Sequence, residues 1–201
     1  MSSSPPKRRS QTDVRRQIVH EAMQLLWDHP LRDITVKMIM ERTGLSRPSF
    51  YLHFNSIPEL MEERLAELEQ VMVAATIGWL STTDDDPETL RNALRGLVGV
   101  VAENGAVFRA IAEAATLDAR LAETWGEFMG QWDTAVAARI RVGQELGYFP
   151  DIDPEWTAFV FNRMDSAVLI EALGKRPQKD PEAVCEAIFE VWRRTLYAAA
   201  R

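Results

Sequence analysis

Side chains that donate hydrogen bonds gather in one short stretch of the chain, where Ser46, Arg47, Ser49 and Tyr51 follow one another closely. Hydroxyl and guanidinium groups bind phosphate oxygens and the edges of bases, so their grouping favours nucleic-acid recognition over catalysis. Each residue also has a plainer interpretation, with Arg47 as a solvated charge and Tyr51 as a packing residue. The pattern becomes informative only if a structural element presents all four side chains outward.

A second group of residues has the character of a lining for a small apolar molecule. Large apolar side chains recur at helical spacing between residues 118 and 146, in the order Leu121, Trp125, Phe128, Met129, Trp132, Val136 and Ile140. Such a stripe is equally typical of a core. The six tryptophans of the chain favour a pocket, because aromatic walls with sparse polar groups are typical of ligand sites. Asn162 and Asp165 are polar anchors in an otherwise apolar segment, or partners of each other's side chains across a dimer.

Residue patterns that would support catalysis or metal binding are missing. The three histidines, His20, His29 and His53, lack ligand spacing, and no glycine-rich phosphate loop or nucleophile elbow occurs. The single cysteine, Cys185, lies among apolar neighbours, which indicates packing, and it cannot form an internal disulfide. We therefore expect no catalytic residues, no metal and no cofactor, and a reducing, cytoplasmic compartment.

The elements that must position the donors are two short helices. Thr35 is placed to cap the first helix, and Ser46 to cap the second, with Arg47 and Pro48 in its first turn. Between them, Gly44 can adopt the left-handed conformation that a tight helix end requires. Two short helices joined in this way predict a helix-turn-helix, whose second helix, here residues 46–53, enters the major groove of DNA.

The rest of the chain is also predicted to be helical. A helix from Thr12 should stop before Pro30, and a capping box at Ser56 to Glu59 should open a long helix to about residue 80. Three Asp-Pro-Glu sequences, beginning at Asp86, Asp153 and Asp180, each read as a helix start. They lead us to expect helices at 87–102, 105–115, 118–146, 154–173 and 181–199. No segment alternates with a period of two, so the predicted fold is all-α.

The predicted organisation is a three-helix head and a six-helix body. Residues 1–56 carry a formal charge of +4 and the remaining 145 residues −11, which favours a nucleic-acid-binding head on an acidic body. We expect residues 1–11 to be a disordered basic arm, either simply solvated or touching phosphates. Residues 12–56 should form the DNA-binding domain and 57–201 the ligand-binding and dimerisation domain. No signal peptide or stretch able to span a membrane is apparent.

The helix-turn-helix stretch resembles the TetR family of bacterial repressors. The resemblance rests on Ile34-Thr35-Val36 and on the run from Thr43 to Phe54, and the Arg-Pro-Ser-Phe-Tyr variant is similar to the EthR-like branch of that family. It implies a homodimer that binds palindromic double-stranded DNA and is released by a small ligand. Three departures stand out, because Met40 replaces a small residue, Thr43 an alanine, and Ile57 a lysine that meets a phosphate. We expect the basic arm, or Arg15 and Arg16, to compensate for that lysine.

Residue by residue, the resemblance and the donor pattern together predict two sites. The DNA-binding residues are Thr35, Lys37, Ser46, Arg47, Pro48, Ser49, Tyr51 and His53. The residues that line the site for a small apolar ligand are Phe108, Ile111, Trp125, Phe128, Met129, Trp132, Phe161, Asn162, Asp165 and Trp192. The last two helices should make the dimer, with Val184, Ile188, Val191, Trp192 and Leu196 as one interface stripe. Two alternatives remain: a helical ligand-binding protein without DNA binding, and an enzyme. An activator is a variant of the main interpretation.

Overall fold

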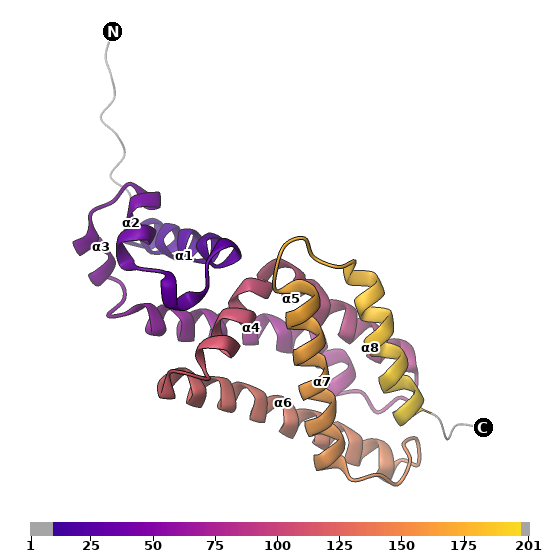
Figure 1. The fold of residues 1–201 in the computed structure, drawn as a ribbon. Coiled ribbons are helices and arrows are strands. Elements are labelled where there is room, and N and C mark those ends of the chain that lie inside the picture. The colour runs from indigo at the N-terminus through magenta and orange to yellow at the C-terminus, as the bar shows by residue number, and fades with distance from the viewer. Residues whose placement is uncertain (1–9, 198–201) are drawn as a thin grey trace.

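The computed structural model describes residues 10–197 and builds them from α-helices, with one short 3-10 helix and no strand in that range. The all-α prediction is confirmed. The head contains α1 (Gln11–Asp28), η1 (Leu31–Asp33), α2 (Val36–Thr43) and α3 (Arg47–Tyr51). The body contains α4 (Ile57–Leu80), α5 (Pro87–Ala114), α6 (Ala119–Glu145), α7 (Pro154–Leu173) and α8 (Pro181–Leu196). Figure 1 shows the head at one end and the described C-terminal end of α8 near the other.

The first helix begins earlier than the sequence suggested. Ser10 accepts a hydrogen bond from the backbone N–H of Asp13, and the Asp13 carboxylate accepts one from the Ser10 backbone, which forms a complete capping box. Because Ser10 caps α1 and Gln11 begins it, these two residues do not belong to the disordered arm that was predicted for residues 1–11. Residues 1–9, which include Lys7 to Arg9, lie outside the described part of the chain.

The turn between α2 and α3 is fixed by Gly44 and its neighbour. Gly44 has a φ of 68°, the left-handed conformation that ends α2. The Thr43 hydroxyl donates to the Met40 carbonyl (2.8 Å) and accepts from the Leu45 N–H (3.1 Å). Thr43, one of the departures from the family pattern, thus ties the turn together with bonds that an alanine could not make.

The start of α4 departs slightly from the predicted capping box. Ser56 accepts from the backbone N–H of Glu59 at 3.3 Å, as expected. The Glu59 carboxylate, however, accepts from the backbone and side-chain N–H groups of Asn55 (2.6 and 3.0 Å) instead of from the Ser56 backbone. The helix therefore begins where expected, but the second hydrogen bond of the predicted capping box comes from Asn55 instead of Ser56.

The predicted break between helices 87–102 and 105–115 is wrong, because α5 runs unbroken from Pro87 to Ala114. Asn104, interpreted as part of a break, donates to the Val100 carbonyl one turn earlier (2.9 Å). Gly105 serves a close approach, since an added Cβ would stand 2.3 Å from the Leu173 carbonyl oxygen. Within the described residues the body therefore has five α-helices where six were predicted.

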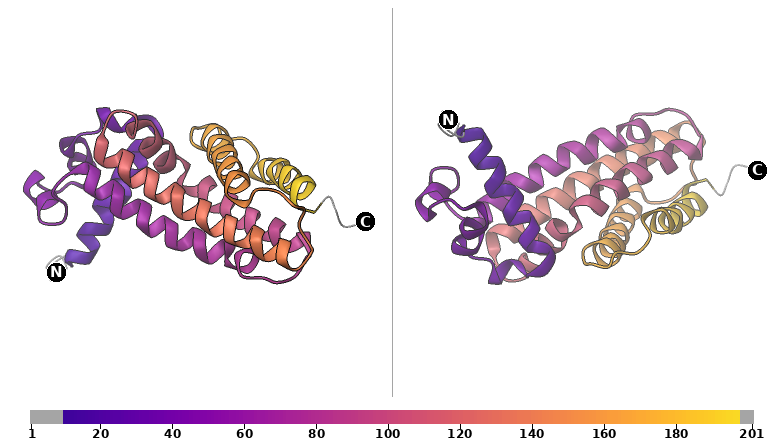
Figure 2. Two further views of the ribbon diagram at one scale, coloured as in Figure 1. Left: turned by 90° about the horizontal axis from the view of Figure 1, so that it is seen from below. Right: turned by 90° about the horizontal axis from the view of Figure 1, so that it is seen from above.

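The body is arranged around α5, which contacts each of the other body helices. In Figure 2, α4 and α6 run side by side along the length of the molecule, with α7 and α8 together beyond them. A hydrogen bond from Trp79 Nε1 to the Tyr197 hydroxyl (3.1 Å) ties α4 to the residue after α8. No helix between residues 10 and 197 is long and apolar enough to pass through a bilayer.

The stripe of α8 that was assigned to a dimer interface is a core surface of the single subunit. Val184, Ile188, Trp192 and Leu196 are all buried, and α8 packs mainly against α5. Val191 alone of the stripe is exposed, with 43% of its surface accessible. The error arose because a helix in a bundle buries one apolar face whether or not a second subunit is present. An interface on α8 must use exposed residues such as Val191.

Candidate nucleic-acid interface and apolar cavity

All eight residues predicted to bind DNA lie on the start of α2 or around α3. Six of them are exposed, namely Thr35, Lys37, Ser46, Arg47, Pro48 and Tyr51. The other two, Ser49 and His53, are half-buried. The helix itself covers 47–51, shorter than the predicted 46–53, because Leu52 caps it and His53 lies in the following turn. The four hydrogen-bond donors are therefore presented together on one short element.

The outward position of these donors follows from the anchoring of α3 by Phe50. Phe50 is fully buried and meets the rings of Tyr51 and Phe54 at 5.4 and 5.6 Å. While Phe50 points inward, Arg47 is exposed in the first turn of the helix and Tyr51 is 49% exposed. Neither residue is folded into the interior, which is what the plainer interpretation would have required. Arg47 makes no ion pair with any residue between 10 and 197.

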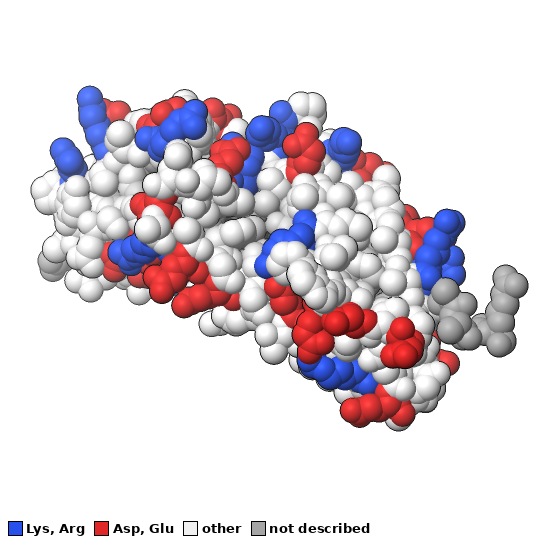
Figure 3. All heavy atoms as spheres, turned by 60° about the horizontal axis from the view of Figure 1, so that its bottom comes forward, with Lys and Arg blue, Asp and Glu red and all other residues white. Residues whose placement is uncertain are grey.

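One of the two arginines proposed to compensate for the missing lysine is already engaged. Arg15 pairs with Glu63 and lies 3.8 Å from Glu67, both on α4, and its guanidinium covers the Phe54 ring at 4.8 Å. It therefore joins the head to α4. Arg16 is exposed and forms no ion pair within residues 10–197. On the face seen in Figure 3, basic and acidic side chains are interleaved over the surface.

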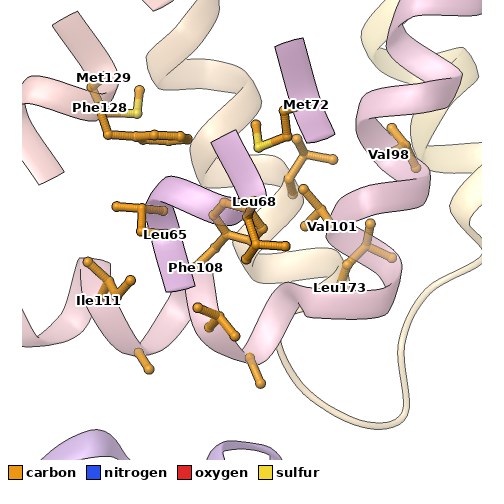
Figure 4. Packing of buried hydrophobic residues seen from close by; sticks show 14 of the residues in the cluster. Leu65, Leu68, Met72, Val98, Val101, Phe108, Ile111, Phe128, Met129 and Leu173 are labelled. Atoms are coloured by element: carbon orange, nitrogen blue, oxygen red, sulfur yellow. The ribbon is translucent and has the colours of Figure 1, made fainter. Parts of the chain in front are cut away.

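An apolar cavity of about 60 Å³ lies between α4, α5, α6 and α7 of the body. Figure 4 shows Phe128 and Met129 of α6 facing Leu65 and Met72 of α4, with Phe108 of α5 beside them. Trp125 stacks on Phe128, with ring centres 5.3 Å apart. The cavity is lined by Met72, Leu97, Val101, Phe108, Trp125, Phe128, Met129, Trp132, Asn162, Asp165, Ser166, Leu169 and Ile170.

A second cavity of about 40 Å³ lies next to the first, toward α8. It shares four lining residues with the first: Leu97, Trp132, Asn162 and Asp165. Its other walls include Trp79 of α4 and Trp192 of α8. The two spaces therefore have a wall in common, and we call them together the channel.

The structure brings together eight of the ten residues predicted to line a ligand site. Seven line the first cavity: Phe108, Trp125, Phe128, Met129, Trp132, Asn162 and Asp165. Trp192 lines the second. Ile111 is fully buried and lines neither, and Phe161 lies behind the wall, tilted against Trp192 at 4.3 Å between ring centres.

Sequence reasoning missed the contributions of α4, the earlier part of α5 and the later part of α7. Ser166 and Leu169 follow Asn162 and Asp165 at helical spacing, so the same face of α7 would have identified them. Met72 lies in the long helix predicted after Ser56, and nothing in the sequence marked it as a lining residue. Leu97 and Val101 carried no separate signal, since nothing in their sequence distinguishes a cavity wall from a filled core.

The cavity has one polar end, at Asp165. Trp192 Nε1 donates to both carboxylate oxygens, at 3.2 and 3.1 Å. Burial raises the pKa of Asp165 to about 7, against the smaller lowering effect of the Trp192 hydrogen bond. The side-chain N–H of Asn162, which also lines the cavity, is already engaged, because it donates to Asp133 (2.8 Å). Trp132 Nε1 is buried without an acceptor among the described residues.

The remaining candidate for chemistry, Cys185, is placed for packing. Its side chain is 1% exposed, and burial raises the pKa of the thiol to about 11, which leaves little of the reactive thiolate. Between residues 10 and 197 no group of three or more His, Cys, Asp or Glu side chains is arranged to hold a metal ion.

Large apolar side chains are also exposed on the outer side of the last two helices. Val160 and Val168 of α7 are 54% and 38% exposed, and Val191 of α8 is 43% exposed. Trp156 and Phe159, near the start of α7, stand out further along the same helix at 67% and 41%. Exposed apolar groups of this kind mark surfaces that another protein can cover.

The N-terminal and C-terminal parts of the chain each match a known protein family. Residues 18–63 match the bacterial regulatory proteins of the tetR family, and residues 90–198 match the C-terminal domain of transcriptional regulator EthR. The HTH-type transcriptional regulator EthR of Mycobacterium tuberculosis is 29% identical over 191 residues, covering 92% of this chain and 87% of the relative.

Two solved structures share the fold at low sequence identity. A TetR-family transcriptional regulator from Syntrophomonas wolfei aligns with a TM-score of 0.75 and 14% identity, covering 92% of this chain and 95% of the other. A transcriptional regulator from Saccharomonospora viridis, solved in complex with choline, aligns with a TM-score of 0.72 and 18% identity, covering 92% and 98%.

Proposed function

The chain belongs to the TetR family of transcriptional regulators, in its EthR-like branch, and from this premise we propose that it is a homodimeric repressor whose hold on operator DNA weakens when a small apolar ligand fills the body cavity. One observation carries the proposal. The helix that follows directly on α3, α4, places Met72 in the cavity wall. A single helix therefore connects the DNA-facing element with the ligand space.

The DNA-binding part of the proposal assigns base contacts to the first turn of α3. Arg47 and the nearby hydroxyls would reach base edges, while Tyr51 and the start of α2 would meet phosphates. Residues 12–56 act as the DNA-binding domain, and 57–201 as the ligand-binding and dimerisation domain. A regulator of this kind works where chromosomal DNA is, so the cytoplasm remains its proposed location.

The dimer part rests on the exposed apolar side chains of α7 and α8. Covering Val160, Val168 and Val191 with a second copy would remove them from water, at about 25 cal/mol for each Å² buried. Two copies of the α7–α8 pair make a four-helix interface. The interface would set the spacing of the two α3 helices, which must suit major grooves about 34 Å apart or a multiple of that distance.

The regulatory part follows from the narrowness of the cavity. At about 60 Å³ the first compartment is too small for a sizeable ligand unless its walls move, and Met72 of α4 is one of those walls. A ligand that binds better when α4 is displaced shifts the population toward dimers with unsuitable head spacing. Such coupling amounts to about 1–3 kcal/mol, or roughly a 5–150-fold change in DNA affinity. The choline complex of the Saccharomonospora viridis protein is an example of this fold with a small molecule.

The direct test is a gel shift with the DNA upstream of the protein's own gene. Wild type should give a specific complex, and Tyr51→Ala should weaken it by about tenfold or more, the effect of losing a contact of 1.4 kcal/mol. Arg141→Ala, which removes an exposed side chain from the far end of α6, serves as the control and should leave binding unchanged. A wild-type protein that binds specific and random DNA equally would contradict the proposal.

The alternative of a ligand-binding protein without DNA binding receives no support from the outward position of Arg47 and Tyr51. It predicts that Tyr51→Ala and wild type behave alike. The family is regulatory, and the buried thiol of Cys185 offers no nucleophile for an enzyme. A reporter gene behind the bound DNA separates repression from activation, since only a repressor raises expression when the protein is deleted.

A further inference from the structure

The polar end of the channel holds a carboxylate that no cation accompanies. Asp165 is 5% exposed and lines both compartments, and its only hydrogen-bond partner between residues 10 and 197 is the indole N–H of Trp192. The nearest basic residue in sequence, Arg163, is turned away and pairs with Asp133 at 3.0 Å. The carboxylate therefore faces the channel without a neutralising charge.

A buried carboxylate in this situation is energetically incomplete. Removing a charge from water is unfavourable unless an opposite charge or several hydrogen bonds replace the water. One neutral indole donor shared between two oxygens replaces only part of it. The protein responds by holding the proton more tightly, and the raised pKa of Asp165, about 7, is that response. A cation delivered by a ligand would satisfy the same need.

The walls around Asp165 suit an organic cation in particular. Trp132, Trp79 and Trp192 all line the second compartment, and the rings of Trp79 and Trp192 meet edge to face at 5.5 Å. Aromatic faces attract ammonium groups, most strongly when the pair is shielded from water. Trp132 Nε1, buried without an acceptor, offers one hydrogen bond to a ligand oxygen. Beyond this end, the wall formed by Phe108, Phe128 and Met129 is apolar.

We propose that the natural ligand is an amphiphilic amine, with its positive nitrogen beside Asp165 and its apolar tail along Phe108 and Phe128. An oxygen close to the nitrogen would accept from Trp132 Nε1. The proposal rests on the ligand-responsive function proposed above and narrows its ligand class. The site should bind a protonated amine more tightly than a neutral alcohol or a carboxylate of equal length, because only the amine balances the charge of Asp165.

Binding of three eight-carbon probes to the purified full-length dimer tests this choice. Octylamine, octanol and octanoate are compared by calorimetry at pH 7.5, where a simple alkylamine is protonated. A charge-assisted hydrogen bond contributes about 1.5–3 kcal/mol, so octylamine should bind about 10–100-fold more tightly than octanol. Asp165→Asn keeps the size of the side chain and an acceptor for Trp192. This variant should lower the affinity for octylamine by about the same factor. Its affinity for octanol should stay within about threefold of the wild-type value.

Asp133→Asn is the matched control, because it removes a carboxylate on the facing helix that already has Arg163 as a partner. It should change octylamine affinity by less than about threefold. If Asp165→Asn fails to fold, as judged by its circular dichroism, the wild-type preference for amine over alcohol still decides the matter.

The outcomes separate this proposal from the broader one. Octanol or octanoate binding wild type as tightly as octylamine would overturn the amine assignment while leaving a ligand-binding cavity in place. An unchanged octylamine affinity in Asp165→Asn would do the same. Binding by none of the three probes would overturn it together with the apolar-ligand part of the proposed function, whereas DNA binding would stand on its own gel shift.

Discussion

Arg109, on α5, donates a hydrogen bond from its guanidinium to the carbonyl oxygen of Leu26 in the last turn of α1. The same side chain donates through Nε to the carbonyl of Gly174 (2.9 Å), at the end of α7, and is 7% exposed. A positive charge at the C-terminal end of a helix also complements its dipole. The residue before it, Phe108, lines the cavity. Neighbouring positions on α5 thus contact the ligand space and the head.

Arg109→Met should lower the stability of the protein substantially. Methionine keeps the apolar stem, but the buried carbonyls of Leu26 and Gly174 lose their donors, each worth about 1.5–3 kcal/mol when the donor is charged. We expect the free energy of unfolding in urea to fall by about 2–4 kcal/mol. Arg95→Met on the same helix is the control, because Arg95 is half-exposed and loss of its solvated pair with Glu182 should lower the free energy of unfolding much less. Equal losses in the two variants would contradict a bridging role for Arg109.

Arg47→Ala should change how DNA binding depends on salt. If the guanidinium reaches a phosphate, its loss lowers the slope of log affinity against log salt by about 1, whatever the DNA sequence. If it reaches a base edge, the slope stays and discrimination between operator and random DNA falls, by about 1–3 kcal/mol. Fluorescence anisotropy at several salt concentrations distinguishes the two. If both the salt slope and the discrimination stay unchanged, Arg47 does not touch DNA, even though it is exposed and forms no ion pair within residues 10–197.

The features that the sequence predicted are those decided within a few residues. Asp86, Asp153 and Asp180 cap the helices expected of them, and each accepts from a backbone N–H in the first turn. Gly44 ends α2 with the expected positive φ. These outcomes depend on side chain-to-backbone bonds inside a single turn, which the local sequence determines.

The features that it missed depend on partners far along the chain. A break was predicted just before Gly105, but α5 is continuous there and Gly105 packs closely against Leu173, a contact that no local pattern could reveal. The stripe of α8 was assigned to a second subunit because an apolar face does not say which surface covers it. Trp125, Phe128, Met129 and Trp132 were found because large apolar residues recur there at helical spacing. Asn162 and Asp165 were found because they are polar in an otherwise apolar segment. Leu97 and Val101 were missed for want of any such signal.

Asp165→Asn should make the protein more stable relative to wild type as the pH rises. The ordinary pKa of 3.8 is raised to about 7 in the folded protein by burial, so the folded state keeps this proton through a range in which the unfolded state has lost it. The stability that wild type gains from this difference is fully present below about pH 4 and is lost as the pH rises through 7. Asparagine does not titrate.

The free energy of unfolding of Asp165→Asn minus that of wild type should therefore increase by about 2–3 kcal/mol between pH 5 and pH 8. Denaturant unfolding of both proteins at the two pH values measures it. Charged groups nearby, such as the pair of Arg163 with Asp133, are common to both proteins and cancel in the difference. A difference independent of pH would mean that Asp165 is ionised throughout, or that another cation balances it.

Two glycines of α5 should respond in opposite directions to alanine. An added Cβ at Gly105 would meet the Leu173 carbonyl oxygen at 2.3 Å and its carbon at 2.8 Å, so α5 and α7 would have to separate. Overpacking of this kind costs about 1–3 kcal/mol, more than the 0.5–1 kcal/mol that alanine gains over glycine within a helix. At Gly99 no atom lies within 4 Å of an added Cβ, so only the gain remains. We expect Gly105→Ala to lower the melting temperature and Gly99→Ala to raise it.

Because Gly105 is followed on α5 by Phe108 and Arg109, separation of the two helices should also weaken ligand binding, whereas Gly99→Ala should leave it unchanged. A Gly105→Ala protein as stable as wild type would show that α5 and α7 do not approach as closely as described.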